Sequence, residues 1–209
     1  MCAIFTDRVL DRTVSKLYDR AYFEHWYRKG DIGGPQRLAR KVALAVHTAE
    51  YYLERPIRSV LDIGCGEGAW RAPLLKLRPR VHYLGFDSSE YAVARHGARR
   101  NLHLTAFGDF AYLRPCAPAD LLICSDVLHY VPSAELRRGL PGLAELTGGI
   151  AFLETFTEED EFEGDHAGFQ ARPASWYRRQ LKKAGLRPIG SHCWAGAAMG
   201  DGLASLESP

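Results

Sequence analysis

The chain has 209 residues, 46% of them hydrophobic, and its 27 basic and 25 acidic residues give a net charge of +2. This length suffices for one domain with a full core, and the charge offers no argument for a nucleic-acid or membrane-surface partner. The five cysteines lack the paired spacing of a zinc or redox site. No run of 18 apolar residues and no signal-peptide pattern occur, so we expect a cytoplasmic protein without a membrane span.

Residues 1–55 predict a helical extension or lid that precedes the main domain. Apolar residues recur at helical spacing between Val14 and His25. After a glycine-rich interruption, Pro35 suits the first turn of a second helix, which should end before Pro56. The apolar stripe of that helix consists of Leu38, Val42, Ala45, Val46, Ala49 and Leu53.

From Ile57 onward, short apolar runs alternate with helical patterns. We expect strands at 59–63, 81–86, 101–106, 119–124, 149–154 and 187–194, and helices at 69–77, 89–97, 133–146 and 173–184. Pro141 should break or restart the third helix, because proline lacks an amide donor. The alternation predicts an α/β fold, a Rossmann-like, doubly wound and mostly parallel sheet of six or seven strands with helices on both faces. This domain would span residues 56–194, followed by a flexible tail at 195–209.

A turn with three alternating glycines follows the first predicted strand, in the segment Val60-Leu-Asp-Ile-Gly-Cys-Gly-Glu-Gly68. Glycine can adopt unusual backbone angles and lets a ligand approach the main chain. The pattern therefore predicts a nucleotide site. It leaves the nucleotide open, because Gly64-x-Gly66-x-x-Ala69 also fits the loose dinucleotide fingerprint.

Acidic residues lie at or just after the ends of four predicted strands, namely Asp62, Asp87, Asp109 and Asp126. Ligands of such sheets bind at the carboxyl ends of the strands. An acid about 20 residues beyond the glycine turn can accept both hydroxyls of a ribose, and Asp87 is so placed. These positions define the candidate site.

Four segments resemble the motifs of the class I S-adenosylmethionine (SAM)-dependent methyltransferases. They are Leu61–Gly68, Gly85–Ser89, Gly108–Phe110 and Asp120–Tyr130, within a resemblance that covers about residues 57–194. It implies SAM as cofactor and S-adenosylhomocysteine (SAH) as product. The cofactor-binding positions that it implies are Asp62, Gly64, Cys65, Gly66, Gly68, Asp87, Ser88, Asp109, Phe110, Ser125 and Asp126.

The resemblance also implies a role for several of these positions. Asp62 and the glycine turn would face the methionine part, Asp87 the ribose, and Asp109 the adenine amino group, with Phe110 packed on the adenine ring. Ser125 and Asp126 would lie beside the methionine. SAM carries a sulfonium and an ammonium but no phosphate, so a pocket lined by acids suits it better than it suits a pyrophosphate. No Lys or Arg between residues 60 and 69 is present to hold a phosphate.

Candidate catalytic residues are His129, which follows the fourth strand and has a near-neutral intrinsic pKa, and Glu154 at the end of the fifth strand. A general base is optional for methyl transfer, and His129 could instead shape the pocket or bond to backbone. Candidate substrate-binding residues are the aromatic side chains Tyr18, Tyr22, Trp26 and Tyr130.

The segment 154–170 is long for an α/β connection, so it is expected to be a lid or disordered. Its acids and His166 also raise the alternative of a divalent metal site, with Glu163 and Asp165 as the other first candidates. We expect no metal.

The expected activity is methyl transfer to an oxygen or nitrogen of a small molecule. No Asn-Pro-Pro-Tyr-like sequence follows the fourth strand, which weakens a case for nucleobase or amide methylation. Nucleic acid is therefore an unlikely partner, and the arginines at 95, 99 and 100 are too few to indicate one. An RNA or protein methyltransferase and a SAM-binding regulatory protein without catalysis remain the alternatives.

Overall fold

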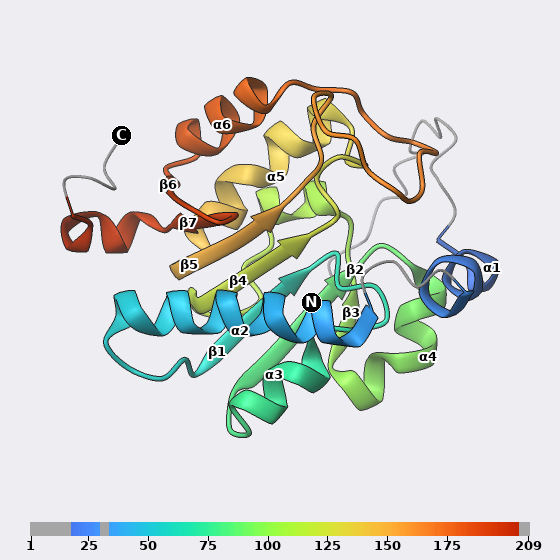
Figure 1. Ribbon diagram of the computed structural model, residues 1–209, viewed down its shortest axis with the longest axis horizontal. Helices are drawn as coiled ribbons and strands as arrows, with labels where there is room; N and C mark the ends of the chain where they lie inside the picture. Colours follow the sequence, from blue (N-terminus) through green and yellow to red (C-terminus); the bar gives the residue numbers. More distant parts are fainter. Residues whose placement is uncertain (1–17, 30–33, 205–209) are drawn as a thin grey trace, which may run out of the picture.

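The computed structural model describes residues 18–29 and 34–204, which form a seven-stranded sheet between two layers of helices (Figure 1). The strand order is β3-β2-β1-β4-β5-β7-β6. The strands are β1 Ser59–Ile63, β2 His82–Asp87, β3 Leu102–Leu104, β4 Ala119–Ser125, β5 Thr147–Glu154, β6 Arg187–Gly190 and β7 Cys193–Ala195. Strands β1 to β5 pair in parallel, whereas β7 is antiparallel to β5 and β6. The predicted Rossmann-like fold class is confirmed.

Helices pack on both faces of this sheet. They are α1 Arg20–Phe23, α2 Gly34–Leu53, α3 Arg71–Leu77, α4 Glu90–Arg100, α5 Ser133–Glu145 and α6 Ala174–Lys183, with a π-helix η1 at Glu24–Lys29 and 3-10 helices η2 at Phe107–Ala111 and η3 at Ala197–Gly202. Apolar residues of α2 and α3 belong to one core cluster, and those of α5 and α6 belong to another. Among the described residues, none of these helices combines the length and the apolar character that a membrane crossing needs.

The central strand β4 shows why its sequence reads as a continuous apolar run. Leu121 and Ile123 face the core cluster under α2 and α3, while Leu122 and Cys124 face the cluster under α5 and α6. All four side chains are fully buried. A parallel strand that is covered on both faces needs apolar residues at every position. The carboxyl end of this strand then delivers Ser125 and Asp126 to the edge where a ligand would bind.

The last predicted strand, 187–194, is in fact a hairpin of β6 and β7, which gives the sheet its seventh strand. The turn between them places Ser191 and His192 at φ values of 49° and 63°. Two consecutive left-handed residues match the twist of a tight hairpin, and residues other than Gly, Asn and Asp seldom adopt them. The turn signal in the sequence is therefore limited to Gly190, which precedes these two residues with a φ of 93°. Ordered elements continue past residue 194, with Ala195 buried in β7 and η3 ending at Gly202.

The prediction that Pro141 breaks its helix is wrong, because α5 is continuous from Ser133 to Glu145. Its glycines allow an unusually close approach to η2. A Cβ on Gly142 would lie 1.7 Å from the carbonyl oxygen of Phe110, and one on Gly139 would lie 2.4 Å from that of Phe107. This packing, together with the buried leucines of α5, offsets the backbone hydrogen bond that proline removes.

The N-terminal prediction is met only in part. Val14 lies outside the described residues, and α1 is a short helix that starts after Asp19, whose side chain accepts a hydrogen bond from Tyr22 N at 2.9 Å. Phe23 is buried against Tyr91 of α4, with the ring centroids 5.7 Å apart. This contact holds the N-terminal segment beside α4 (Figure 1).

Candidate cofactor and acceptor site

The glycine turn is fastened to the end of β2 by main-chain hydrogen bonds. Gly64 and Gly66 have φ values of 73° and 54°, in the left-handed region that favours glycine. Gly64 N and Cys65 N both donate to the carbonyl oxygen of Phe86, at 2.7 and 3.0 Å. The sharp turn therefore ends β1 directly beside Asp87.

Asp87 connects the glycine turn to α4. Its Oδ2 accepts from Gly66 N at 2.6 Å and its Oδ1 accepts from Ser89 N at 2.8 Å. Burial raises the pKa of Asp87, and these backbone donors act against that rise. Each carboxylate oxygen has a second lone pair. The side chain can therefore receive two further hydroxyl donors, as a ribose would offer.

The glycine at position 64 is required by the protein itself. A Cβ there would lie 2.3 Å from a methyl carbon of Val127, the second residue after β4. Real Cβ contacts are never that short. The turn after β1 thus packs directly against the segment after β4, and its glycine brings Asp126 and Val127 close to the candidate site.

Asp62 is almost fully buried at the base of this turn. Tyr83 Oη donates to its Oδ2 at 2.6 Å. Burial raises the pKa of Asp62 to about 7, and the nearby Asp87 adds to the rise, while the Tyr83 hydrogen bond opposes it. Cys65 lies beside both acids, and burial with their negative charge raises the pKa of its thiol. This thiol therefore stays neutral and is not a nucleophile.

Asp62 should make the stability of the protein fall as the pH rises. Its pKa is 3.8 in the unfolded chain and about 7 in the folded one, so between these values the folded state binds more protons. We expect the free energy of unfolding of wild type, relative to Asp62→Asn, to decline across this window and to level off above it. Denaturant titrations at several pH values measure this.

Asp120 provides the matched control for that measurement. Arg55 donates to this carboxylate and lowers its pKa, against the effect of burial. The stability of wild type relative to Asp120→Asn should therefore rise with pH. The stabilisation from Asp120 is fully present above the unfolded pKa and is lost on acidification. Equal slopes for the two variants would contradict the assignment of Asp62 as a carboxyl with a raised pKa.

At the ends of β4 and β5, charges from three elements meet. Ser125 Oγ donates to Glu154 Oε2 at 2.6 Å, and Lys41 of α2 donates to the same oxygen. Lys41 Nζ also lies 3.9 Å from Asp126 Oδ2. Partial burial and the negative charge of Glu154 raise the pKa of Asp126 to about 6, while Lys41 and Arg37 oppose the rise.

The contacts of Glu154 favour an ionised, structurally paired carboxylate over a general base. Burial by itself would raise the pKa of Glu154, but the hydrogen bonds from Lys41 and Ser125 outweigh it and hold the pKa below its ordinary value. An ionised carboxylate whose pKa is lowered by two donors accepts a proton weakly. Glu154 instead anchors α2 to the sheet.

His129 is buried, whereas a general base must be accessible to the acceptor. Its side chain is 1% exposed, and its Nδ1 lies 3.1 Å from Thr155 Oγ1 and accepts from Phe156 N at 3.3 Å. A ring nitrogen that receives a backbone N–H carries no proton and is already engaged as an acceptor. The alternative role, in which His129 shapes the pocket and bonds to backbone, fits these contacts.

The 154–170 connection is an ordered loop built on aromatic contacts. Phe162 stacks on Phe156 and on His166, with ring centroids 4.5 Å apart in both pairs. Tyr130 Oη donates to the carbonyl oxygen of Asp165 at 2.6 Å, which ties the loop to the segment after β4. Within the described residues no three potential metal-ligating side chains come together, Glu163, Asp165 and His166 included.

Tyr18 lies near Ser89, Asp87 and Tyr130. The carbonyl oxygen of Tyr18 accepts from Ser89 Oγ at 2.5 Å. Burial, with the charges of Tyr130 and Asp87, raises the pKa of the Tyr18 hydroxyl. The structure therefore brings these three residues together, and Tyr22 packs edge-on against Tyr18 at 5.0 Å.

Other expected site residues lie apart from this group. Phe110 is fully buried in the core against Phe86, at 5.6 Å between ring centroids, so its ring is not positioned to stack on adenine. Asp109 is exposed on η2, where its Oδ2 accepts from Ala106 N at 3.1 Å. Trp26 contacts His25 at 4.7 Å, and no contact joins it to the strand ends within the described part of the chain.

Two residues of the site were missed from the sequence, and one of them had a signal. Lys41 falls three residues after Leu38 and four before Ala45, on the apolar stripe of α2, and a cation at such a position indicates a buried partner. Arg172 is 5% exposed and donates to the carbonyl oxygens of Leu128 and Val131. It precedes Pro173 in a loop, where no periodicity distinguishes it.

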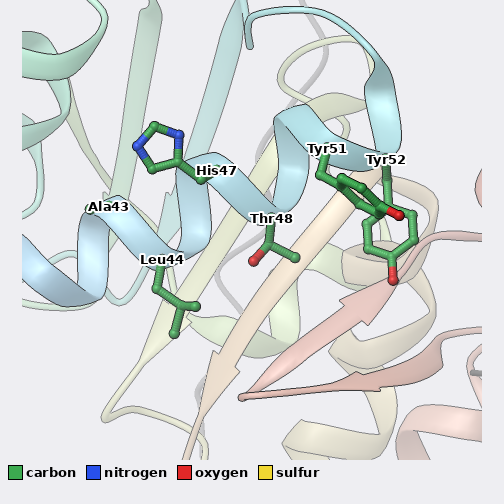
Figure 2. Close-up of a pocket in the computed structure, with 6 residues that line it drawn as sticks. All are labelled: Ala43, Leu44, His47, Thr48, Tyr51 and Tyr52. Atoms are coloured by element: carbon green, nitrogen blue, oxygen red, sulfur yellow. The ribbon is translucent and has the colours of Figure 1, made fainter.

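A separate hollow of about 450 Å³ lies along the outer side of α2 (Figure 2). Its lining residues all belong to this one helix and are Ala43, Leu44, His47, Thr48, Tyr51 and Tyr52. None of them is a strand-end residue of the candidate site. This hollow is therefore distinct from the carboxylate-lined edge of the sheet.

Comparison with known proteins shows that part of this chain is similar to methyltransferases. A family model described as a methyltransferase domain matches residues 61–148. A trans-aconitate 2-methyltransferase of Azoarcus sp. is 27% identical over 143 residues, which are 65% of this chain and 53% of that protein. The chain thus spans about half the length of this curated relative.

Solved structures show the same fold at lower identity. A sugar N-methyltransferase, KedS8 from Streptoalloteichus sp., superposes with a TM-score of 0.63 at 18% identity, covering 94% of this chain and 98% of that one. The magnesium protoporphyrin IX methyltransferase of Synechocystis, solved with bound SAH, has a TM-score of 0.60 at 19% identity and covers 86% and 96%. This chain thus contains a segment that matches a methyltransferase domain, and it shares its fold with solved SAM-dependent methyltransferases.

Proposed function

We propose that this protein transfers a methyl group from SAM to an oxygen or nitrogen of a small-molecule acceptor. One observation carries the proposal. Asp87 is held rigidly by Gly66 N and Ser89 N at the end of β2, with lone pairs left for a ribose and with Asp62 and Asp126 at the neighbouring strand ends.

The chemistry of these residues fits SAM better than a dinucleotide. The strand ends present carboxylates, which attract a cation, and the segment 60–69 has no basic side chain to hold a pyrophosphate. Asp87 would hold the ribose hydroxyls, Asp62 and Asp126 would lie on the methionine side, and Asp109 would be available to the adenine. When bound, SAM supplies an activated methyl group, and the protein's task is to align acceptor and cofactor.

The acceptor atom best suited to this site is one that needs no deprotonation. Neither sequence-based candidate for a general base is available as one, because His129 Nδ1 receives the Phe156 N–H and Glu154 is paired with Lys41. A carboxylate oxygen is ionised at neutral pH and requires no base. The name of the curated relatives, trans-aconitate 2-methyltransferase, also supports a carboxylate acceptor.

The arrangement of arginines gives less support to an RNA substrate. Arg95 and Arg99 are exposed on α4, but Arg100 Nη1 donates to the carbonyl oxygen of Glu67 at 2.5 Å. Two exposed arginines on one helix are a weak electrostatic footprint for a polyanion. The small-molecule acceptor is therefore the stronger proposal.

Calorimetric titration with SAH and with NAD tests the cofactor. We expect SAH to bind and NAD not to bind, and tight binding of NAD alone would overturn the proposal. Transfer of a labelled methyl group from SAM is then measured with a panel of carboxylic acids that includes trans-aconitate, with hydroxyl and amine compounds, and with transfer RNA. Transfer to transfer RNA alone would favour the RNA methyltransferase, and SAH binding without transfer to any acceptor would favour a regulatory protein.

A further inference from the structure

A pocket of about 220 Å³ lies between α6 and the strands β5, β6 and β7, at the side of the sheet that ends in the β6–β7 hairpin (Figure 1). Four residues of α6 line it, namely Ala174, Tyr177, Arg178 and Leu181. Their spacing of three or four residues places them on one face of the helix. We call this cavity the α6 pocket.

The α6 pocket is separate from the charged groups at the strand ends. Side chains alternate between the two faces of a strand. Leu153 and Thr155 line the α6 pocket, whereas Glu154 between them is bonded to Lys41 of α2, on the other face of the sheet. None of the described residues that line the pocket is a candidate cofactor-binding residue. A ligand bound here would therefore lie apart from the carboxylates that face the cofactor.

Much of the lining of the α6 pocket is apolar. Leu153, Leu181 and Trp194 are buried, and Pro188 of β6 is paired with Trp194 of β7 in the hairpin. An added Cβ on Gly190 would meet no atom within 4 Å, so the pocket is open beside the hairpin turn. A dry cavity of about 150 Å³ holds a benzene molecule. The α6 pocket therefore has room for one aromatic ring with a small head group.

Arg178 gives this lining a positive charge that no acid neutralises. None of the described residues that line the pocket is acidic, and within the described part of the chain no hydrogen bond or ion pair engages the Arg178 guanidinium. His192 also lines the pocket, but its ring packs against Phe152, in the core cluster under α2 and α3. Thr155 and Tyr177 add hydroxyl-bearing side chains, which can donate to a carboxylate. An unpaired guanidinium can bind a carboxylate through two parallel hydrogen bonds.

We propose that the α6 pocket is a second small-molecule site, which binds an aromatic carboxylate with its ring against Leu181 and Trp194 and its carboxylate on Arg178. An apolar lining with a few polar groups is the usual composition of such sites. The proposal goes beyond methyl transfer, because this binding requires neither SAM nor turnover. Benzoate has the size and the charge that fit the pocket, and benzamide has a similar shape without the charge.

The binding is measured by titrating benzoate into the nitrogen-15-labelled protein without cofactor and following the backbone amide signals by NMR. We expect saturable shifts at Thr155, Ala174 and Gly190, and none at Gly66 and Ser89 beside Asp87. Benzamide should bind about 10-fold more weakly, because a hydrogen bond to a charged group is stronger than one between neutral groups. Absence of saturable shifts, or shifts confined to the cofactor edge, would overturn the proposal.

Arg178→Gln should weaken the binding of benzoate by about 3- to 10-fold and leave that of benzamide unchanged, because it removes the charged donor. Arg179→Gln is the matched control. Arg179 is the next residue of α6, is exposed and does not line the pocket, so its substitution makes the same change in net charge. It should leave the affinity for benzoate at the wild-type value. Equal losses in the two variants would show attraction by net charge alone and would refute the role of Arg178.

Ala174→Leu tests the cavity itself. A larger side chain at this lining position occupies part of the pocket, so both benzoate and benzamide should lose about 10-fold or more in affinity. Ser175→Leu, at an exposed neighbour that does not line the pocket, should change neither. Thermal melts confirm that each variant is folded. Wild-type affinity of a folded Ala174→Leu protein for both ligands would place them elsewhere and reject the α6 pocket as their site.

A titration in the presence of saturating SAH separates this proposal from the proposed function. The benzoate shifts at Thr155, Ala174 and Gly190 should persist when SAH is bound. Their loss would show that the pocket belongs to the cofactor site and would contradict its independence. Failure of SAH itself to bind would count against the proposed function alone, since the benzoate titration needs no cofactor.

Discussion

Asp87→Asn should weaken the binding of SAH by about 10- to 100-fold, because hydrogen bonds to a charged acceptor contribute ~1.5–3 kcal/mol. Both oxygens of Asp87 already receive a backbone N–H, from Gly66 and from Ser89. Asparagine has a single side-chain oxygen, so its NH2 group would lie against one of these backbone N–H groups, and two donors would be in contact. The substitution therefore loosens the glycine turn as well as removing the charge that a ribose would meet. Isothermal titration with SAH measures the loss.

Glu90→Gln is the matched control for this result. Glu90 is exposed in the first turn of α4, three residues from Asp87, and its substitution removes one negative charge without touching the glycine turn. It should leave the affinity for SAH unchanged. Equal affinities of Asp87→Asn and wild type would show that Asp87 does not hold the cofactor, whatever the fold.

Gly142→Ala should destabilise the protein although alanine is the better helix former. In an isolated helix the change would be favourable by about 1 kcal/mol. Here the added Cβ would lie 1.7 Å from the carbonyl oxygen of Phe110 and 2.7 Å from its carbonyl carbon, and a backbone group cannot move aside cheaply. Overpacking of this kind costs ~1–3 kcal/mol or more, so we expect a net loss of about 2 kcal/mol. The melting temperature should fall by roughly 2–4 °C per kcal/mol.

Gly185→Ala separates steric crowding from backbone strain. Gly185 follows α6 with a φ of 98°, and nothing lies within 4 Å of an added Cβ. Its substitution carries only the left-handed penalty of ~1–2 kcal/mol per residue. Gly142→Ala should in addition weaken SAH binding, because η2 carries Asp109, whereas Gly185→Ala should not. A larger effect of Gly185→Ala on the affinity for SAH would contradict this packing argument.

The sequence predicted the parts of the site that depend on strand ends and tight turns. Asp87 could be placed because its spacing from the glycine turn follows from one βαβ unit, and parallel strands deliver their carboxyl ends to one edge. The sequence does not decide where Phe110 points, because an aromatic residue after a strand can face either the pocket or the core. The contacts of Phe110 with Phe86 and with α5 decide for the core.

The roles of His129 and Glu154 depend on partners far away in the chain. Lys41 is 113 residues from Glu154, and Thr155 and Phe156, which contact His129 Nδ1, are 26 and 27 residues from it. A pattern of neighbouring residues carries no information about such partners. Burial and hydrogen-bond direction, which are tertiary properties, determine whether each side chain can accept a proton.

By itself, the sequence determined the α/β fold, the glycine turn and the acidic edge of the sheet, because periodicity and spacing are local and strand ends converge by topology. The cofactor class followed from the resemblance of four segments to known motifs. Only the tertiary structure decided that α5 continues through Pro141, that the sheet has a seventh strand, and that the two expected bases are engaged by other groups. Close packing of glycines against backbone and the pairing of buried polar groups are the physical reasons, since both require segments that are distant in sequence to meet.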